Sequence, residues 1–323
     1  MLGFTLSLAL GAAALAPIPP AVSPAVSTIG QTAASQAAET SPAGAPTDLG
    51  DVVIEGRRLE EATRDFVATV GQPARGRALA RWRDGVCVGV ANLRAETAQY
   101  IVDRVSTVAQ DLGLKPGAPG CTPGVLIVAT TDANAFTEAF VARRPRLFVL
   151  GGSGTDLGRN ALEKFQTTDR PVRWWTVSLP VDRDTGEIAV RLPGHSAPII
   201  SRAGLSTFST QIVDDTGRVF VIIDIDRIDG VSLTQLGDYI AMVSLAQVDP
   251  DADTSAYATV LNLFDTPEQV DGLTEWDMAY LHGLYESQRI LANPGASRDE
   301  IASSIVRVRR QMVRNAEGPP PTP

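Results

Sequence analysis

The stretch RVFVIIDIDRIDGVSLTQLGDYIAMVSLAQ (218–247) decides the fold class that the sequence predicts. Its first part, VFVIIDID (219–226), is an apolar run ending in aspartates, which is typical of a buried strand. Its second part, VSLTQLGDYIAMVSLAQ (231–247), has the length and apolar content of a buried helix. A strand followed directly by a packed helix indicates a protein of mixed α and β structure.

A second strand–helix–strand pattern lies upstream of this stretch. GVCVGVANL (85–93) and VLIVATT (125–131) have strand character, and apolar residues recur at helical spacing from Ala98 to Leu112 between them. Parallel strands joined by a right-handed crossover are the default for such a unit. We therefore expect an α+β fold, with a mixed β-sheet and helices packed on it.

Other short strands are expected from apolar runs and turn signals. Single strands are predicted at 52–56 and 146–150, and hairpins pair 172–180 with 187–193 and 211–213 with 219–223. No internal repeat is visible, so we expect one α+β domain over residues 51–316.

The two ends of the chain have the composition of segments outside that domain. LGFTLSLALGAAALA (2–16) is typical of the apolar part of a signal peptide within residues 1–25, and an uncleaved apolar anchor is the alternative. Residues 26–50 are rich in Ala, Pro, Ser and Thr and predict a disordered spacer, and 317–323 predict a disordered tail. We expect a periplasmic or secreted protein without a transmembrane helix in its mature form.

Charge and cysteine content narrow the classes of partner and compartment. A net charge of −9 and a pI of about 4.8 argue against nonspecific nucleic-acid binding, which needs a basic surface. Cys87 and Cys121 fit a disulfide in an oxidising compartment, and two buried free thiols are the alternative.

The order of elements, and residues 231–285 in particular, carry a resemblance to a known family. Leu273, Thr274, Asp277, Leu281, Leu284 and Tyr285 match the helix that follows the metal site in zincin-type metallopeptidases. Val260, Leu261 and Asn262 stand where those enzymes place the segment under the metal. The chain also resembles an uncharacterised family of exported proteobacterial proteins with a zincin-like scaffold.

The resemblance stops at the helix that should bind zinc. In zincins this helix carries HExxH, whose positions here fall on residues 238–242, with no histidine and no glutamate. The resemblance thus implies a pseudoenzyme with no zinc and no cofactor. It also implies a groove lined by Asp238, Tyr239 and Met242, which would bind a peptide, a wall component or an envelope protein along a strand edge.

Two other kinds of chemistry stay open from the sequence. Ser153 in a glycine-rich turn and His195 in a Pro/Gly loop are the one serine–histidine pair that could serve a metal-free hydrolase. Asp249, Asp251 and Asp253 are spaced like the start of a calcium loop, but the glycine and glutamate of that loop are missing. We expect solvated acidic turns there.

Overall fold

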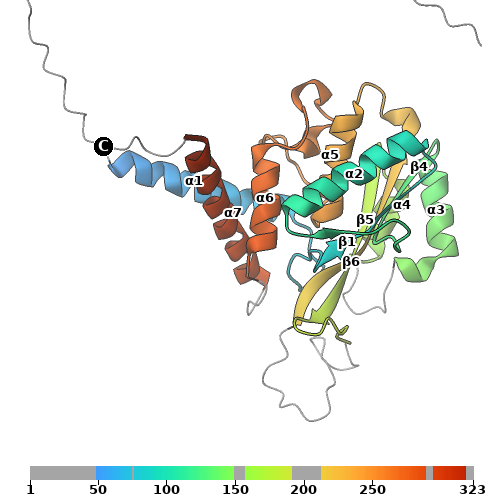
Figure 1. The fold of residues 1–323 in the computed structure, drawn as a ribbon, viewed down its shortest axis with the longest axis horizontal. Helices are drawn as coiled ribbons and strands as arrows, with labels where there is room; N and C mark the ends of the chain where they lie inside the picture. Colours follow the sequence, from blue (N-terminus) through green and yellow to red (C-terminus); the bar gives the residue numbers. More distant parts are fainter. Residues whose placement is uncertain (1–48, 75, 149–156, 191–211, 289–293, 318–323) are drawn as a thin grey trace, which may run out of the picture. The chain divides into compact units, whose positions relative to one another are not determined.

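The computed structural model describes residues 49–317 except Arg75 and the segments 149–156, 191–211 and 289–293 (Figure 1). These residues belong to one compact unit. Its centre is a four-stranded sheet with helices packed on it, which confirms the α+β class. In spatial order the strands are β2 (Val88–Ala91), β4 (Val125–Thr130), β6 (Ile212–Asp224) and β5 (Val172–Asp182).

Three of the four strands are parallel. β2 pairs with β4 and β4 pairs with β6 in parallel, and β5 joins β6 antiparallel at one edge. The connection from β2 to β4 runs through α2 (Ala95–Asp111), which buries Ile101, Val105 and Val108. The predicted strand–helix–strand unit is therefore confirmed.

The disulfide is confirmed next to this unit. Cys87 lies between β1 (Gly85–Val86) and β2, and it is bonded to Cys121 with a Cα–Cα distance of 6.2 Å. β1 also pairs in parallel with β3 (Lys115–Pro116). The bond therefore joins the start of β2 to the loop that leads into β4, and neither cysteine is free.

Each face of the sheet has its own layer of helices, because side chains alternate along a strand. Val219, Val221 and Ile223 of β6 pack into the core that includes α2 and α5 (Leu233–Leu245). Phe220 and Ile222 point to the other face, where α3 (Ala133–Arg143) and α4 (Arg159–Thr167) contribute a second core. Figure 1 shows the two helical layers on either side of the strands.

Two helices of the first layer begin with reciprocal side-chain caps. Ser232 and Gln235 form a capping box at the start of α5, and Thr274 and Asp277 form another at the start of α6 (Glu275–Glu286). The buried carboxylate of Asp277 also accepts bonds from the Thr259 hydroxyl and, at 2.8 Å, from the Val260 N–H. One side chain thus caps α6 and fixes the segment before it.

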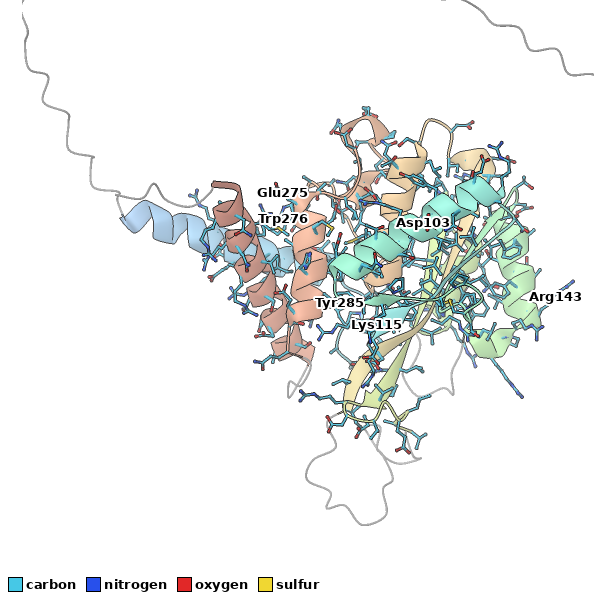
Figure 2. All side chains as sticks on the ribbon, viewed as in Figure 1. Asp103, Lys115, Arg143, Glu275, Trp276 and Tyr285 are labelled. Atoms are coloured by element: carbon cyan, nitrogen blue, oxygen red, sulfur yellow. A yellow bond between two sulfur atoms is a disulfide. The ribbon has the colours of Figure 1, made fainter. Side chains whose placement is uncertain are left out.

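Helices α1 (Leu49–Val70), α6 and α7 (Pro294–Glu317) pack beside the first layer. An aromatic cluster around Phe66 of α1 includes the rings of Tyr257, Trp276 and Tyr280 (Trp276 is labelled in Figure 2). Short 3-10 helices complete the described chain at Pro145–Leu147, Ile225–Arg227, Val260–Asn262 and Pro267–Gln269.

Several of the shorter predicted strands are wrong. Residues 52–56 belong to α1, and the 3-10 helix Pro145–Leu147 occupies the start of the strand expected at 146–150. The expected hairpin around DDTG is one continuous strand, β6, whose main partner is β5. From the strand expected at 187–193, Ile188 makes one isolated bridge to Val181, and residues 191–193 lie outside the described chain.

The continuity of β6 has a physical cause in its neighbours. The carboxylates of Asp214 and Asp215, which signalled a turn, accept bonds from the guanidinium groups of Arg77 and Arg83. The register between β5 and β6 shifts between Val177 and Ser178, so the strand passes Gly217 as a bulge instead of turning back.

Candidate binding site

A cavity of about 420 Å³ lies along the open edge of β5. Its lining includes the four consecutive residues Arg173–Thr176. Consecutive side chains of a strand point to opposite faces of the sheet, so a cavity that contacts all four follows the edge rather than one face. The volume is within the range of ligand pockets in proteins.

The main chain of β5 offers hydrogen-bonding groups toward this edge. The N–H of Asp224 donates to the carbonyl of Pro171 at 2.8 Å, which marks 171 and 224 as a hydrogen-bonded pair. Bonded and non-bonded pairs alternate in an antiparallel ladder, so Trp174 and Thr176 direct their N–H and C=O away from β6. No other described residue hydrogen-bonds these four main-chain groups.

One wall of the cavity is α4, which covers the second face of the sheet. Asn160, Ala161 and Lys164 line it from the helix. The position of α4 is set by Arg173, whose guanidinium donates to the carbonyls of Gln166 at 2.9 Å and Thr168 at 2.7 Å. A cation at the last carbonyls of a helix stabilises its C-terminal end. Burial lowers the pKa of this guanidinium.

The opposite wall is the turn after α5, residues 247–251. The indole N–H of Trp174 donates to the carbonyl of Val248 at 3.0 Å and fixes the turn to β5. The segment that follows α1 fixes it from the other side, because the N–H of Gln72 donates to the carbonyl of Gln247 at 3.0 Å. The two walls therefore come from opposite faces of the sheet, and the strand edge lies between them.

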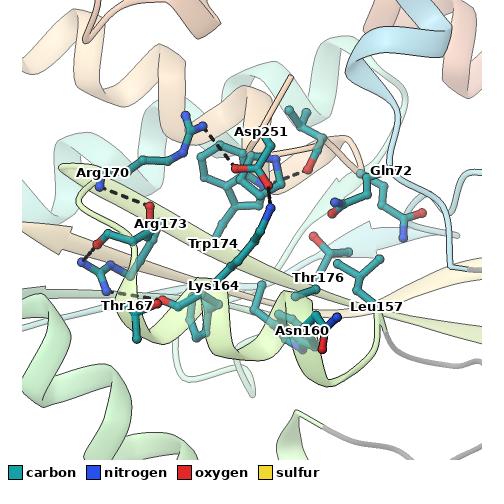
Figure 3. A pocket seen from close by; sticks show the side chains of 17 residues that line it. Gln72, Leu157, Asn160, Lys164, Thr167, Arg170, Arg173, Trp174, Thr176 and Asp251 are labelled. Atoms are coloured by element: carbon teal, nitrogen blue, oxygen red, sulfur yellow. Dashed lines mark hydrogen bonds and ion pairs between the residues drawn. The ribbon is translucent and has the colours of Figure 1, made fainter. Parts of the chain in front are cut away.

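An ion pair joins the two walls. Figure 3 shows the side chain of Lys164 extending from α4 to Asp251 in the turn, where the Nζ–Oδ2 distance is 2.7 Å. Arg170 contacts the other oxygen of the same carboxylate at 3.5 Å. These cations hold the pKa of Asp251 below its ordinary value, and Asp251 raises the pKa of Lys164.

Buried polar atoms without a partner concentrate at this cavity. Among the described residues, six buried side-chain nitrogen or oxygen atoms lack a hydrogen bond, and four of them belong to its lining: Arg173 Nε, Trp175 Nε1, Thr176 Oγ1 and Gln247 Nε2. A buried polar group without a partner is costly, which makes such a cluster unusual. These four atoms are themselves closed to solvent, so they belong to residues of the lining without facing the cavity.

A second cavity, of about 660 Å³, lies between α2 and the loop 116–123. It reaches β2, the strand at the other edge of the sheet. None of the six partnerless atoms in the described chain belongs to its lining. We therefore place the candidate site at β5.

The structure does not place the predicted groove residues at a surface. Asp238 and Tyr239 are 3% exposed, and Met242 is fully buried in the core below the sheet. The Asp238 carboxylate is bonded to the guanidinium of Arg104 and, at 2.8 Å, to the N–H of Leu273. Burial raises the pKa of the Tyr239 hydroxyl. The expected groove on this helix is therefore wrong, because these side chains hold α5 in the core.

The acidic turn does not form a calcium site among the described residues. Asp249 accepts from the amide of Gln72 at 2.9 Å, Asp251 pairs with Lys164, and Asp253 accepts from the Ser255 hydroxyl at 2.6 Å. No group of three His, Cys, Asp or Glu side chains in the described chain could hold a metal ion. Each aspartate thus has a separate partner.

Ser153 and His195 lie outside the described residues, so the structure does not bear on their pairing. Within the described part of the chain, no helix combines the length and apolar character needed to cross a bilayer. Comparisons with protein-family models, with curated proteins and with solved structures found no match.

The sequence predicted the strand that carries the site but not the site itself. Arg173 and Thr176 are 2% and 4% exposed in a strand covered on both faces. The signal in the sequence that could have indicated the site was the presence of polar residues in such a strand, because buried polar side chains need hydrogen-bond partners.

Proposed function

We propose that this protein is an exported, non-catalytic binding protein that holds an extended peptide along the open edge of β5. The observation that carries the proposal is the position of the cavity along Arg173–Thr176, where the main-chain groups of Trp174 and Thr176 have no partner in the described chain. An extended peptide that adds as a further strand would supply those partners.

The dimensions of the edge suggest the length of the ligand. Four strand residues span about 13 Å at roughly 3.3 Å per residue. A peptide of about four residues would therefore lie along the edge between α4 and the turn 247–251. Side chains that alternate on such a peptide would meet α4 on one side and Gln72 and Gln247 on the other.

A degenerate zincin-like scaffold is part of this proposal. Helix α5 carries neither histidine nor glutamate, so it cannot supply the HExxH ligands. A disulfide is typical of proteins outside the cytoplasm, which supports export. Peptides of the cell wall or extended segments of envelope proteins are the ligands that such a compartment offers.

The proposal can be tested with mixtures of N-acetylated, C-terminally amidated tetrapeptides, in which one position at a time is held at each amino acid. We expect the wild-type protein to bind a subset of these mixtures in surface plasmon resonance. Thr176→Pro removes the main-chain N–H that faces the ligand, and proline is tolerated where an edge N–H faces outward. Loss of this hydrogen bond should weaken binding by about tenfold or more, which corresponds to about 1.4 kcal/mol.

Thr176→Val is the matched control, since it keeps the main-chain N–H and the shape of the side chain. It should bind at least about tenfold more tightly than Thr176→Pro. If Thr176→Pro misfolds by circular dichroism, N-methylation of successive ligand amides makes the same test on the wild-type protein. Failure of every mixture to bind, or binding that is indifferent to proline and to N-methylation, would rule out strand addition at β5.

A further inference from the structure

The four partnerless buried atoms in residues that line the cavity are all able to donate a hydrogen bond. Arg173 Nε, Trp175 Nε1 and Gln247 Nε2 can only donate, and the Thr176 hydroxyl can donate or accept. The orientation of the Gln247 amide follows from its oxygen, which accepts from the N–H of Ala80 at 2.9 Å. Among these four side-chain atoms, donors therefore outnumber acceptors.

The charges that line the cavity have the same bias. Lys164, Arg170 and Arg173 are cations, and Asp251 is the one carboxylate of the lining. Nearby, the Asp249 carboxylate is engaged by the amide of Gln72 and by the N–H of Asp251 at 2.9 Å. The lining is thus positive by two charges, three cations against one anion, although the whole chain carries −9.

The ion pair across the cavity is open to exchange. The side chains of Lys164 and Asp251 are 69% and 49% exposed. Exposed ion pairs contribute little to stability, so another carboxylate can replace Asp251 at little cost. Among the described residues, Lys164 and Arg170 contact no carboxylate other than Asp251, and they share it.

Resting on the function proposed above, we infer that the bound peptide carries a carboxylate that occupies the position between Lys164 and Arg170. This carboxylate takes over part of their contact with Asp251. A carboxylate paired with a lysine and an arginine forms charge-assisted bonds, which are stronger than those of a neutral amide.

The test uses the same tetrapeptide mixtures with Asp, Glu, Asn or Gln fixed at each position, as C-terminal amides and as free acids. We expect at least one position at which Glu or Asp binds about tenfold more tightly than Gln or Asn, as for a charge-assisted bond. A preference for free acids would identify the C-terminal carboxylate as the source, and a preference for fixed Glu or Asp would identify a side chain.

Two variants assign the preference to these residues. Lys164→Gln should reduce the preference to about threefold or less. Asp251→Asn should strengthen binding of the acidic mixtures, because the Asp251 carboxylate no longer competes with the ligand for Lys164 and Arg170. The gain should be larger at low salt, where charges are screened less. Lys115→Gln is the matched control, because Lys115 is the other lysine of the chain and is exposed away from the cavity. It should leave the preference unchanged.

The two proposals fail in different ways. Mixtures that bind through the β5 edge with no preference for an acidic residue or a free carboxylate would overturn the inference and leave strand addition intact. A preference for acidic residues that is as large in Lys164→Gln as in Lys115→Gln would also overturn the inference. No binding by any mixture would overturn both.

Discussion

At the residue scale, the carboxylate of Asp251 decides how the cavity is charged and how its walls are joined. It receives Lys164 from α4 and Arg170 from the segment before β5. Each of these contacts favours the ionised form of Asp251, and hydrogen bonding from Lys164 is the largest cause of its lowered pKa. The same carboxylate is the group that a ligand would have to replace.

Nuclear magnetic resonance titration of the Asp251 carboxyl carbon tests this arrangement. We expect its pKa to lie below the ordinary aspartate value of 3.8, because Lys164 and Arg170 stabilise the charged form. Lys164→Gln should raise the pKa toward 3.8, and Lys115→Gln should leave it unchanged. A pKa that is the same in all three proteins would mean that Lys164 does not pair with Asp251 in solution.

The roles of single residues were the part least predictable from sequence. Asp238, Tyr239 and Met242 were placed at a groove by the zincin resemblance, and all three lie in the core. The sequence alone does not distinguish a buried aspartate that pairs with an arginine from an exposed aspartate. Which of the two Asp238 is depends on Arg104, 134 residues away, and periodicity carries no information about that contact.

At the element scale, the disulfide and its loop stabilise the edge of the sheet opposite the site. Cys87 and Cys121 are 34 residues apart in sequence, so the bond restricts a loop that contains all of α2. In the chain-entropy account, a loop of this length contributes about 3 to 4 kcal/mol of stability. A Cβ at Gly117 would overlap the Cys121 sulfur, so glycine is required beside the bond.

Equilibrium denaturation tests this role of the disulfide. Replacing both cysteines by alanine should lower the free energy of unfolding by about 3 kcal/mol, chiefly through the larger freedom of the unfolded chain. Gly117→Ala should destabilise the wild type and have a smaller effect when both cysteines are alanine, because the overlap with the sulfur then disappears and only the close contacts with the Cβ and Cα of residue 87 remain. Equal effects in the two backgrounds would show that Gly117 is not constrained by the sulfur.

Elements whose apolar residues recur with a clear period were predicted well. Elements whose extent depends on contacts with residues far away in the sequence were not. The helix at α2 and the strand at β4 follow directly from the spacing of their apolar residues. In place of the single strand β6, the sequence pattern predicts a hairpin, because Asp214, Asp215 and Gly217 resemble a turn in isolation. Arg77 and Arg83, which neutralise those aspartates, lie more than 130 residues upstream.

At the scale of the whole molecule, the order of the strands creates the candidate site. β5 follows β4 in sequence and yet lies outside β6, so one of its edges stays unpaired in the described chain. Layers on both faces then enclose that edge between α4 and the turn 247–251. Sequence patterns predicted the fold class but not the strand order, and the site depends on the order.

The most direct test of the central claim is amide hydrogen exchange at β5 with and without a bound tetrapeptide. Arg173 and Trp175 face β6 and serve as internal controls, because their N–H groups are already paired. Strand addition predicts that exchange slows at Trp174 and Thr176 on binding and stays unchanged at Arg173 and Trp175. A peptide that binds without slowing Trp174 and Thr176, or that slows all four alike, would contradict the claim.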